Sequence, residues 1–346
     1  MLFTLFRKQV QATGLLGICL CPGGIALAHA VPPGTGSSSS DPGMPLPRLA
    51  HCEFQPLGEG DDPQLVLRSR LQQLKFTQIP VATALASNDY HLQMLPAPQV
   101  EAQELHQAMR WQMKDRIDFD IGDAVIDVFE VPGQKERGRV PQIYVVAARR
   151  QPVQRLIDVF EGADAKLEYI DIPELAQRNI AAQLPGDQTG VALLVLGEFS
   201  GTLTLTRQGV LYLARELEQG GVALQPEPVR SGGGLALAGD HAARQHALDA
   251  VVLELQRSLD YYESHFAQAP ITRLVIAPQM TLDAEVPDAL SQMLGLPVEL
   301  LDLNQLLQLD PPLSLTVQAA CLTAMGLALR GNPLATPSKE GAHAAG

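Results

Sequence analysis

The two halves of this sequence open with the same pattern: an apolar strand, a glycine turn and a return strand. In the first half, apolar side chains alternate with small residues or cysteine over 16–20, and a turn signal follows at 22–24. In the second half, the apolar run 191–196 leads into a turn at 197–201, after which leucines alternate with threonines. This repeated opening predicts an α/β protein built from two similar lobes.

The first thirty residues allow two interpretations. A basic start, an apolar stretch and the small residues at 28–30 are typical of a secretory signal peptide with its cleavage site. Pro22-Gly23-Gly24, however, is turn chemistry that would break an apolar helix at its centre. We therefore expect a β-hairpin over 14–30. A mature chain beginning at Val31 would instead indicate an exported, periplasmic protein.

Composition narrows the range of partners. The chain has 346 residues, of which 46% are hydrophobic and 18% charged, and its formal net charge is −13. An acidic chain lacks the basic footprint that nucleic acid or an anionic membrane requires, so we expect neither nucleic-acid binding nor direct membrane insertion. Four cysteines without a Cys-x-x-Cys pair exclude a disulfide framework and argue against structural zinc.

A small unit interrupts the first lobe. Strand patterns over 90–95, 124–131 and 142–148 surround a helix in which apolar residues recur every four positions from Leu105. The order β-α-β-β indicates an α+β insert, because a parallel sheet would need a helix between successive strands. Further on, the apolar stripe from 248 to 266 predicts the strongest helix of the chain.

These patterns divide the chain into segments. We expect a first lobe at 1–88, with a Pro/Gly/Ser-rich loop at 32–47, continued at 149–186; an inserted subdomain at 89–148; a second lobe at 187–310; a C-terminal helix at 311–331 that packs on the first lobe; and a disordered tail at 332–346.

Two hairpin openings in two α/β halves resemble the actin-like fold, and several ordered segments resemble the PilM/MshI-type proteins of type IV pilus assembly over residues 12–330. Residues 111–120 and 124–127 are similar to the inserted subdomain of that family. Residues 295–299 and 324–330 resemble its closing segments. Within the family, the sequence is most similar to the MSHA-pilus branch, MshI.

The resemblance implies a two-lobed actin-like (ASKHA) fold with a small α+β inserted subdomain. It also implies a cytoplasmic protein, peripheral at the inner face of the inner membrane, that binds the cytoplasmic tail of a PilN-like membrane protein and acts indirectly on the assembly ATPase. The tail groove of the family lies between the first lobe and the insert. Trp111 is a candidate partner-binding residue, although aromatics at helical spacing usually belong to a core.

An actin-like ATPase holds the nucleotide phosphates between two glycine turns and needs an acid beside each turn for Mg²⁺. Here the first forty residues contain no Asp or Glu, and Val195 stands where the family has an Asp. The third nucleotide-binding segment, 277–281, lacks glycine. We therefore expect no catalytic residues, no metal ligands and no cofactor, with ATP–Mg at most a weak vestigial ligand. The vestigial phosphate loops would be Gly23 and Gly24 in the first hairpin and Ser200, Gly201 and Thr202 in the second.

The sequence thus favours a non-catalytic actin-fold scaffold of pilus assembly. Two alternatives stay open at this stage. One is a nucleotide-gated actin-like ATPase of the same machinery, and the other is a periplasmic binding protein, if residues 1–30 are a signal peptide.

Overall fold

A computed structural model describes residues 14–32, 47–132, 140–225, 238–279 and 282–330, in which the chain forms two compact units. The first comprises Met1–Ala176, Leu307–Asp310 and Thr323–Gly331. The second comprises Gln177–Leu306, Pro311–Leu322 and Asn332–Gly346. The loop expected at 32–47 and the tail expected at 332–346 fall almost entirely outside the described residues.

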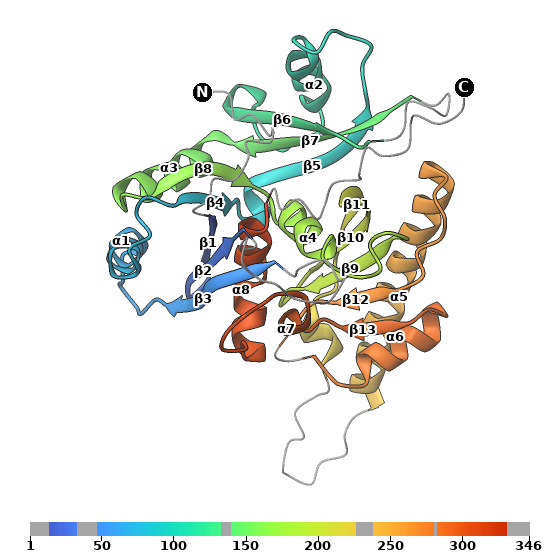
Figure 1. Ribbon diagram of the computed structural model, residues 1–346. Coiled ribbons are helices and arrows are strands. Elements are labelled where there is room, and N and C mark those ends of the chain that lie inside the picture. The colour runs from blue at the N-terminus through green and yellow to red at the C-terminus, as the bar shows by residue number, and fades with distance from the viewer. Residues whose placement is uncertain (1–13, 33–46, 133–139, 226–237, 280–281, 331–346) are drawn as a thin grey trace, which may run out of the picture. The chain divides into compact units, whose positions relative to one another are not determined.

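The first unit is built on a five-stranded sheet in the order β3-β2-β1-β4-β8 (Figure 1). Its strands are β1 (Leu15–Cys21), β2 (Gly24–Val31), β3 (Arg48–Pro56), β4 (Pro80–Ala84) and β8 (Lys166–Asp171). β1 and β2 pair antiparallel from Leu15↔Ala30 to Cys21↔Gly24, so the predicted hairpin is confirmed. Gly23, with φ +77°, follows Pro22 in the turn, which is the signature of a type II turn.

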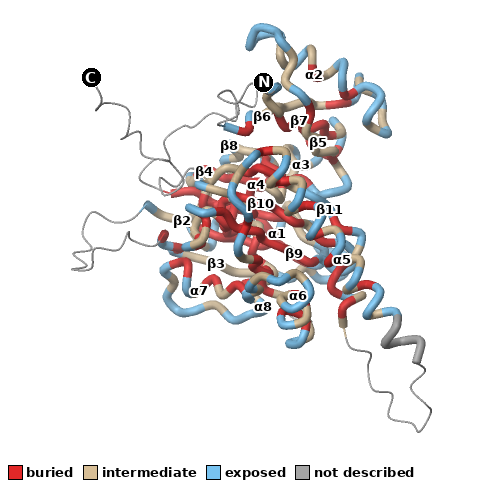
Figure 2. Tube along the Cα trace, turned by 90° about the vertical axis from the view of Figure 1, so that its right-hand side faces the viewer, coloured by how far each residue is buried: buried red, intermediate tan, exposed pale blue. Residues whose placement is uncertain are grey.

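The hairpin lies at the centre of the core. One face of β1 and β2 packs against helices α1 (Pro63–Leu74) and α3 (Arg150–Gly162), with Leu16, Ile18 and Phe160 fully buried. On the other face, Gly17 meets helix α8 (Leu315–Ala328) so closely that an added Cβ would lie 1.9 Å from the Ala324 carbonyl oxygen. Figure 2 shows the sheet strands as largely buried. Only glycine permits this approach of helix and strand.

The insert has the element order predicted for it. β5 (Tyr90–Pro96), α2 (Leu105–Met113), β6 (Ala124–Glu130) and β7 (Gln142–Arg149) form an antiparallel sheet in the order β5-β7-β6 with a helix on one face. Met109 and Met113 of α2 pack against Ile143, Val145 and Ala147 of β7. Short 3₁₀ turns at Ser87–Asp89 and Ile121–Asp123 precede β5 and β6.

The second unit repeats the topology of the first. Its sheet has the order β11-β10-β9-β12-β13, from strands β9 (Val191–Leu196), β10 (Gly201–Arg207), β11 (Val210–Leu217), β12 (Leu274–Ile276) and β13 (Val298–Leu300). As in the first sheet, three antiparallel strands are followed by two parallel ones. The repeat inferred from the two strand–turn–strand openings is thus a repeat of the whole sheet.

The remaining helices are α4 (Pro173–Ala181), α5 (Ala238–Phe266), α6 (Val286–Leu294) and α7 (Leu303–Leu306), with a 3₁₀ turn at Gly221–Leu224. α5 begins ten residues before the apolar stripe at 248, because a helix can continue beyond the residues that it buries. In the described ranges, no helix combines the length and the apolarity needed to cross a membrane.

A buried ion pair holds the end of α8 to the first sheet. Asp171, the last residue of β8, has a side chain only 1% exposed, and its Oδ2 accepts a hydrogen bond from Arg330, two residues beyond α8. The Arg330 guanidinium also lies 4.7 Å from the ring centroid of Tyr169. Asp171 Oδ1 accepts from the Ile172 backbone N–H at 2.9 Å, so both carboxylate oxygens are satisfied.

We predict that Gly17→Ala lowers the free energy of unfolding by at least about 2 kcal/mol, since the new methyl group must displace the α8 backbone. Gly58→Ala is the matched control, because its Cβ would meet only the exposed carboxylate of Asp61, at 3.3 Å, and no backbone atom. Urea denaturation followed by circular dichroism measures both. Equal stability of the two variants would contradict the close helix–strand contact.

We predict that Arg330→Met lowers the free energy of unfolding by about 3–5 kcal/mol, because it leaves the Asp171 carboxylate buried without a countercharge. The double variant Asp171→Asn/Arg330→Met removes that charge and should recover part of the loss. Urea unfolding of both variants checks this. A double variant no more stable than the single one would show that the ion pair does not explain the effect.

Candidate functional site

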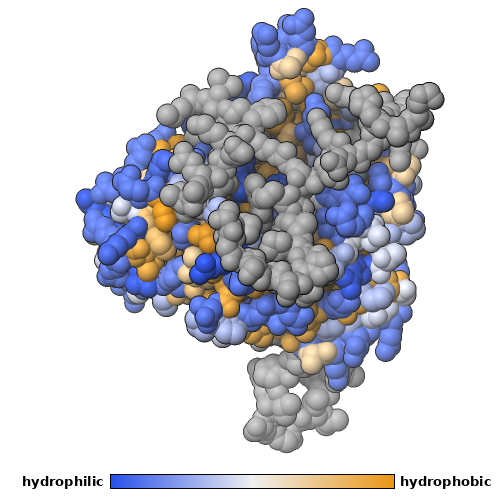
Figure 3. Space-filling model, in the orientation of Figure 1, coloured by the Kyte–Doolittle hydropathy of each residue, from blue (hydrophilic) through white to orange (hydrophobic). Residues whose placement is uncertain are grey.

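The open face of the insert sheet forms one wall of an apolar cavity. Because side chains alternate along a strand, Val125, Asp127 and Phe129 of β6 share one sheet face with Val146 and Ala148 of β7, opposite the face that packs against Met109 and Met113 of α2. In Figure 3, hydrophobic side chains reach the surface over these strands, beside the hydrophilic surface of α2. One face of the sheet therefore serves the insert's own core, and the other is available for a second role.

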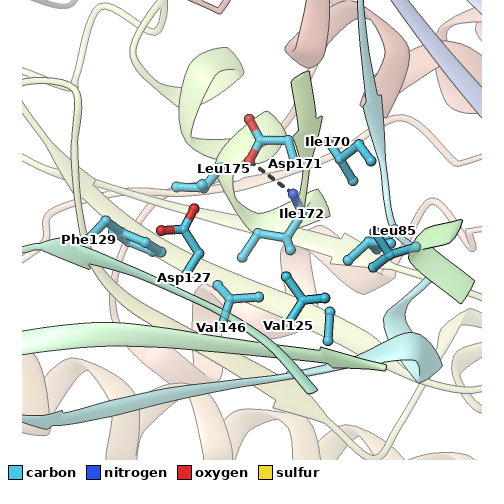
Figure 4. Close-up of a pocket in the computed structure, with 11 residues that line it drawn as sticks. Leu85, Val125, Asp127, Phe129, Val146, Ile170, Asp171, Ile172 and Leu175 are labelled. Atoms are coloured by element: carbon cyan, nitrogen blue, oxygen red, sulfur yellow. Dashed lines mark hydrogen bonds between the residues drawn. The ribbon is translucent and has the colours of Figure 1, made fainter. Parts of the chain in front are cut away.

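The opposite wall comes from the first lobe. It consists of the end of β8, the start of α4, the start of α3 and the residue after β4, which contribute Ile170, Asp171, Ile172, Leu175, Val153 and Leu85 (Figure 4). The walls enclose about 70 Å³, well above the roughly 10–15 Å³ that one water needs. Nine of the eleven lining residues are apolar and the other two are aspartates. The cavity can therefore accept an apolar side chain beside a polar group.

Two outer strands border this apolar cavity. Among the described residues, β6 is an end strand of the insert sheet and β8 is an end strand of the five-stranded sheet. An outer strand keeps one row of backbone N–H and C=O groups outside its own ladder. An extended peptide can pair with such a row while its side chains enter an adjoining pocket.

The two aspartates of the cavity differ in their environments. Asp171 is fully paired, as described above. The Asp127 side chain is 27% exposed and points from β6 across to Leu175 (Figure 4). Its Oδ1 accepts from the Val128 backbone N–H at 2.8 Å and lies 3.5 Å from His106 Nε2. Burial raises the pKa of Asp127, and the negative charge of Asp171 adds to this effect, while the Val128 N–H and His106 oppose it.

Asp127 follows three other aspartates of the insert in the sequence, Asp118, Asp120 and Asp123, and the structure gives them different environments. Asp118 lies 2.7 Å from both His91 and Arg149, and these contacts lower its pKa, the His91 hydrogen bond being the largest cause. Asp120 accepts from the Gly122 backbone N–H at 2.6 Å and so caps a short turn. Only Asp127 reaches the cavity. The alternation over 124–130 was the signal that placed it on the same strand face as Val125 and Phe129.

A second, larger opening of about 580 Å³ lies in the same unit, where the insert meets the start of α3. Its lining mixes charges of both signs, from Arg149, Arg150 and Arg155 on one side and Asp89 and Asp123 on the other. Within the described residues, no group of three or more His, Cys, Asp or Glu side chains could hold a metal ion. Because arginines and aspartates both line this opening, its lining does not by itself indicate whether a ligand would be an anion or a cation.

The glycines of the first hairpin turn are in contact with neighbouring residues of the first unit. The carbonyl oxygen of Gly23 accepts from the Leu57 backbone N–H at 2.9 Å. Gly24 lies under the ring of Phe54, whose Cζ would be 2.2 Å from an added Cβ. Both glycines thus have structural reasons to be glycine, one a positive φ and the other a close contact.

The second hairpin turn is closed in a comparable way. The Gly197 N–H donates to the Ser200 carbonyl at 2.8 Å, and the carbonyls of Gly197 and Glu198 accept from Gly221 and Val222. Gly201 and Thr202 lie inside β10 and pair with both β9 and β11. Of the predicted phosphate-loop residues of this hairpin, Ser200, Gly201 and Thr202, only Ser200 therefore lies in the turn itself.

The third nucleotide-binding segment of the family corresponds here to the chain after β12. Ala277 is buried and donates its N–H to the Leu194 carbonyl at 2.8 Å. The amide of Gln279 packs against Gly221, where an added Cβ would lie 2.1 Å from Gln279 Nε2. Residues 280 and 281 lie outside the described residues.

Trp111, the candidate partner-binding residue, lies on α2 with 70% of its surface exposed. Lys114 Nζ lies 6.0 Å from the centre of its ring. The tryptophan is therefore not part of the core formed by Met109 and Met113 on the same helix. A role in binding stays a prediction.

Comparisons with known proteins agree with this architecture. Residues 64–234 match the family model described as type IV pilus assembly protein PilM. The structure resembles a solved PilM–PilN type IV pilus biogenesis complex with a TM-score of 0.65 and 21% sequence identity, covering 92% of this chain and 99% of that one. No curated protein matches the sequence.

Two weaker likenesses are to a Bacteroides thetaiotaomicron protein with an actin-like ATPase fold and to the cytoplasmic domain of EpsL, from the type II secretion system of Vibrio cholerae. The first has a TM-score of 0.45 and 9% identity, covering 90% of this chain and 96% of that one. The second has a TM-score of 0.44 and 12% identity, covering 81% and 93%. The match of residues 64–234 to the PilM family and the repeated sheets with their insert together show a PilM-like protein with an actin-like fold.

Proposed function

We propose that the protein is a non-catalytic scaffold of type IV pilus assembly that binds the cytoplasmic tail of a PilN-like inner-membrane protein. The observation that carries this proposal is the apolar cavity between the insert and the first lobe, bordered by β6 and β8. The structural neighbour described as a PilM–PilN complex supports the kind of partner.

The tail binds as an extended segment. Its backbone pairs with an outer strand, and one apolar side chain enters the cavity between Val125, Val146 and Leu175. The free energy of binding comes mainly from burial of that side chain, at about 25 cal/mol per Å² of apolar surface. The exposed Trp111 offers a second contact on the other face of the insert, for a further component of the assembly machinery.

The cellular setting follows from the same proposal. The protein lies in the cytoplasm, at the inner face of the inner membrane, and couples the membrane subcomplex to the assembly ATPase. By the sequence resemblance, the protein serves MSHA pili in the way that MshI proteins do. A signal-peptide cleavage after Ala30 would remove β1 and nearly all of β2 from the centre of the first sheet, which disfavours the periplasmic alternative.

The protein does not hydrolyse ATP under this proposal. Two features support it: the segment over 14–32 contains no acid, and the turn of the second hairpin uses its Gly197 N–H and two carbonyls internally. A metal-assisted phosphoryl transfer needs oxygen ligands for Mg²⁺ and a residue to orient the attacking water. The nucleotide-gated ATPase remains the alternative that this reasoning opposes.

We predict that Val125→Phe weakens tail binding at least tenfold, which corresponds to about 1.4 kcal/mol, because the larger ring fills the apolar cavity. Val100→Phe is the matched control, since Val100 is 41% exposed and does not line the cavity. Fluorescence anisotropy with the labelled cytoplasmic segment of the host's PilN-like protein measures the affinity. Unchanged binding by Val125→Phe, in a variant with normal circular dichroism, would place the tail elsewhere.

We predict that about 1 mM Mg-ATP, a concentration at which a micromolar site would be saturated, gives neither a thermal shift nor phosphate release above background. Isothermal titration calorimetry provides a direct check. Micromolar binding that is lost in Ser200→Asp, a variant in an exposed turn, would favour the nucleotide-gated alternative.

A further inference from the structure

We infer that Asp127 selects the occupant of the apolar cavity by binding a positively charged N–H group of the tail, either a Lys or Arg side chain or the amino terminus of the peptide. This inference rests on the proposed function, because it concerns the same cavity. It goes beyond that function because it names the chemical group that the partner must carry and the residue that binds this group.

The first step concerns the surroundings of the carboxylate. Among the described residues that line the insert wall of the cavity, Asp127 is the one acid, and its neighbours there, Val125, Phe129 and Val146, are apolar. A carboxylate tolerates such surroundings while water reaches it, and 27% of this side chain is exposed. An occupant that covers the cavity removes this water. The occupant must then replace the lost hydrogen bonds, or binding is penalised.

The second step excludes the other aspartate. Asp171 already accepts hydrogen bonds at both oxygens, from the Ile172 N–H and from Arg330, and its side chain is almost fully buried. It therefore has its countercharge within the first unit. A cation brought by the tail is attracted by both carboxylates but has an accessible acceptor only at Asp127.

The third step concerns what Asp127 lacks. Its Oδ1 accepts from the Val128 N–H, and its Oδ2 receives no hydrogen bond from the described residues. The nearest basic group is His106 on α2, at 3.5 Å from Oδ1, and a histidine is charged only when it is protonated. A charge-assisted hydrogen bond from an ammonium or guanidinium group fits Oδ2, and such bonds are shorter and stronger than neutral ones.

The pH dependence follows with a defined sign. Burial and the charge of Asp171 raise the pKa of Asp127, so it takes up a proton more readily than an exposed aspartate as the pH falls. Protonation removes the attraction for a cation. The groups that face Asp127 are His106 of α2 and Asp171 of β8, the latter already paired with Arg330.

The test uses the full chain and three synthetic peptides of the cytoplasmic segment of the host's PilN-like protein. They are the native peptide, the same peptide with an acetylated amino terminus, and one in which every Lys and Arg is replaced by Gln. The protein variants are Asp127→Asn and its matched control Asp123→Asn. Asp123 is exposed on the same insert and does not line the apolar cavity. Calorimetry at neutral and mildly acidic pH measures each affinity.

We expect the native peptide to bind Asp127→Asn at least tenfold more weakly than the wild type, and Asp123→Asn within twofold of it. We expect acidification to weaken binding to the wild type more than to Asp127→Asn. A loss of affinity in the acetylated peptide assigns the cation to the amino terminus, and a loss only in the Gln peptide assigns it to a side chain; either result supports the inference.

Native-peptide affinity that is equal for the wild type and Asp127→Asn overturns the inference and leaves the proposed function intact. Equal affinity of the wild type for all three peptides also overturns the inference and leaves the proposed function intact. This comparison uses only the wild-type protein, so it does not depend on whether a variant folds. Failure of the wild type to bind the native peptide at all overturns the proposed function, and the inference with it.

Discussion

The first unit depends on a buried carboxylate that must be neutralised. Asp171 ends β8 deep inside the protein, and its cation, Arg330, comes from the far end of the described chain. The ion pair fixes the end of α8 beside β8, and the Gly17 contact fixes the body of α8 on β1. Two contacts with different physics, one electrostatic and one steric, thus hold the same helix against the same sheet. The end of β8 that these contacts hold also forms part of the first-lobe wall of the apolar cavity, since Ile170, Asp171 and Ile172 line it.

The elements of the fold were largely predictable because local signals agree with the global arrangement. The Pro22-Gly23 turn and the alternation around it specify the first hairpin, and the four-residue spacing from Leu105 specifies α2. The start of α5 at Ala238 was missed, since its first turns carry no apolar stripe. Pairing between distant strands cannot be read in this way, but the similar openings of the two halves correctly indicated two similar sheets.

The candidate site was less predictable, for a physical reason. Its residues come from β6, β7, β8, α3 and α4, and only the tertiary fold brings them together. Residue patterns identify chemistry when the reacting groups are close in sequence or carry a strict spacing. Asp127 has neither property, and in the sequence nothing distinguishes it from its neighbours Asp120 and Asp123. The glycines that were singled out as phosphate loops illustrate the converse: Gly23 and Gly24 meet demands of the turn and of Phe54 that any hairpin of this shape would impose.

Under the proposed function, binding of a tail needs a source of selectivity, and the lining of the cavity offers two that act over different distances. Apolar side chains supply attraction that depends on contact and discriminates poorly among aliphatic residues. A carboxylate in apolar surroundings discriminates strongly, because covering it with an uncharged partner is penalised while covering it with a cation is favoured. The chain's net charge of −13 extends the same preference to longer range, since it accelerates the approach of a basic segment and repels an acidic one. Arg330 completes the arrangement: by neutralising Asp171, it leaves Asp127 as the accessible carboxylate among the described lining residues, which is the acceptor that the inferred cation of the tail requires.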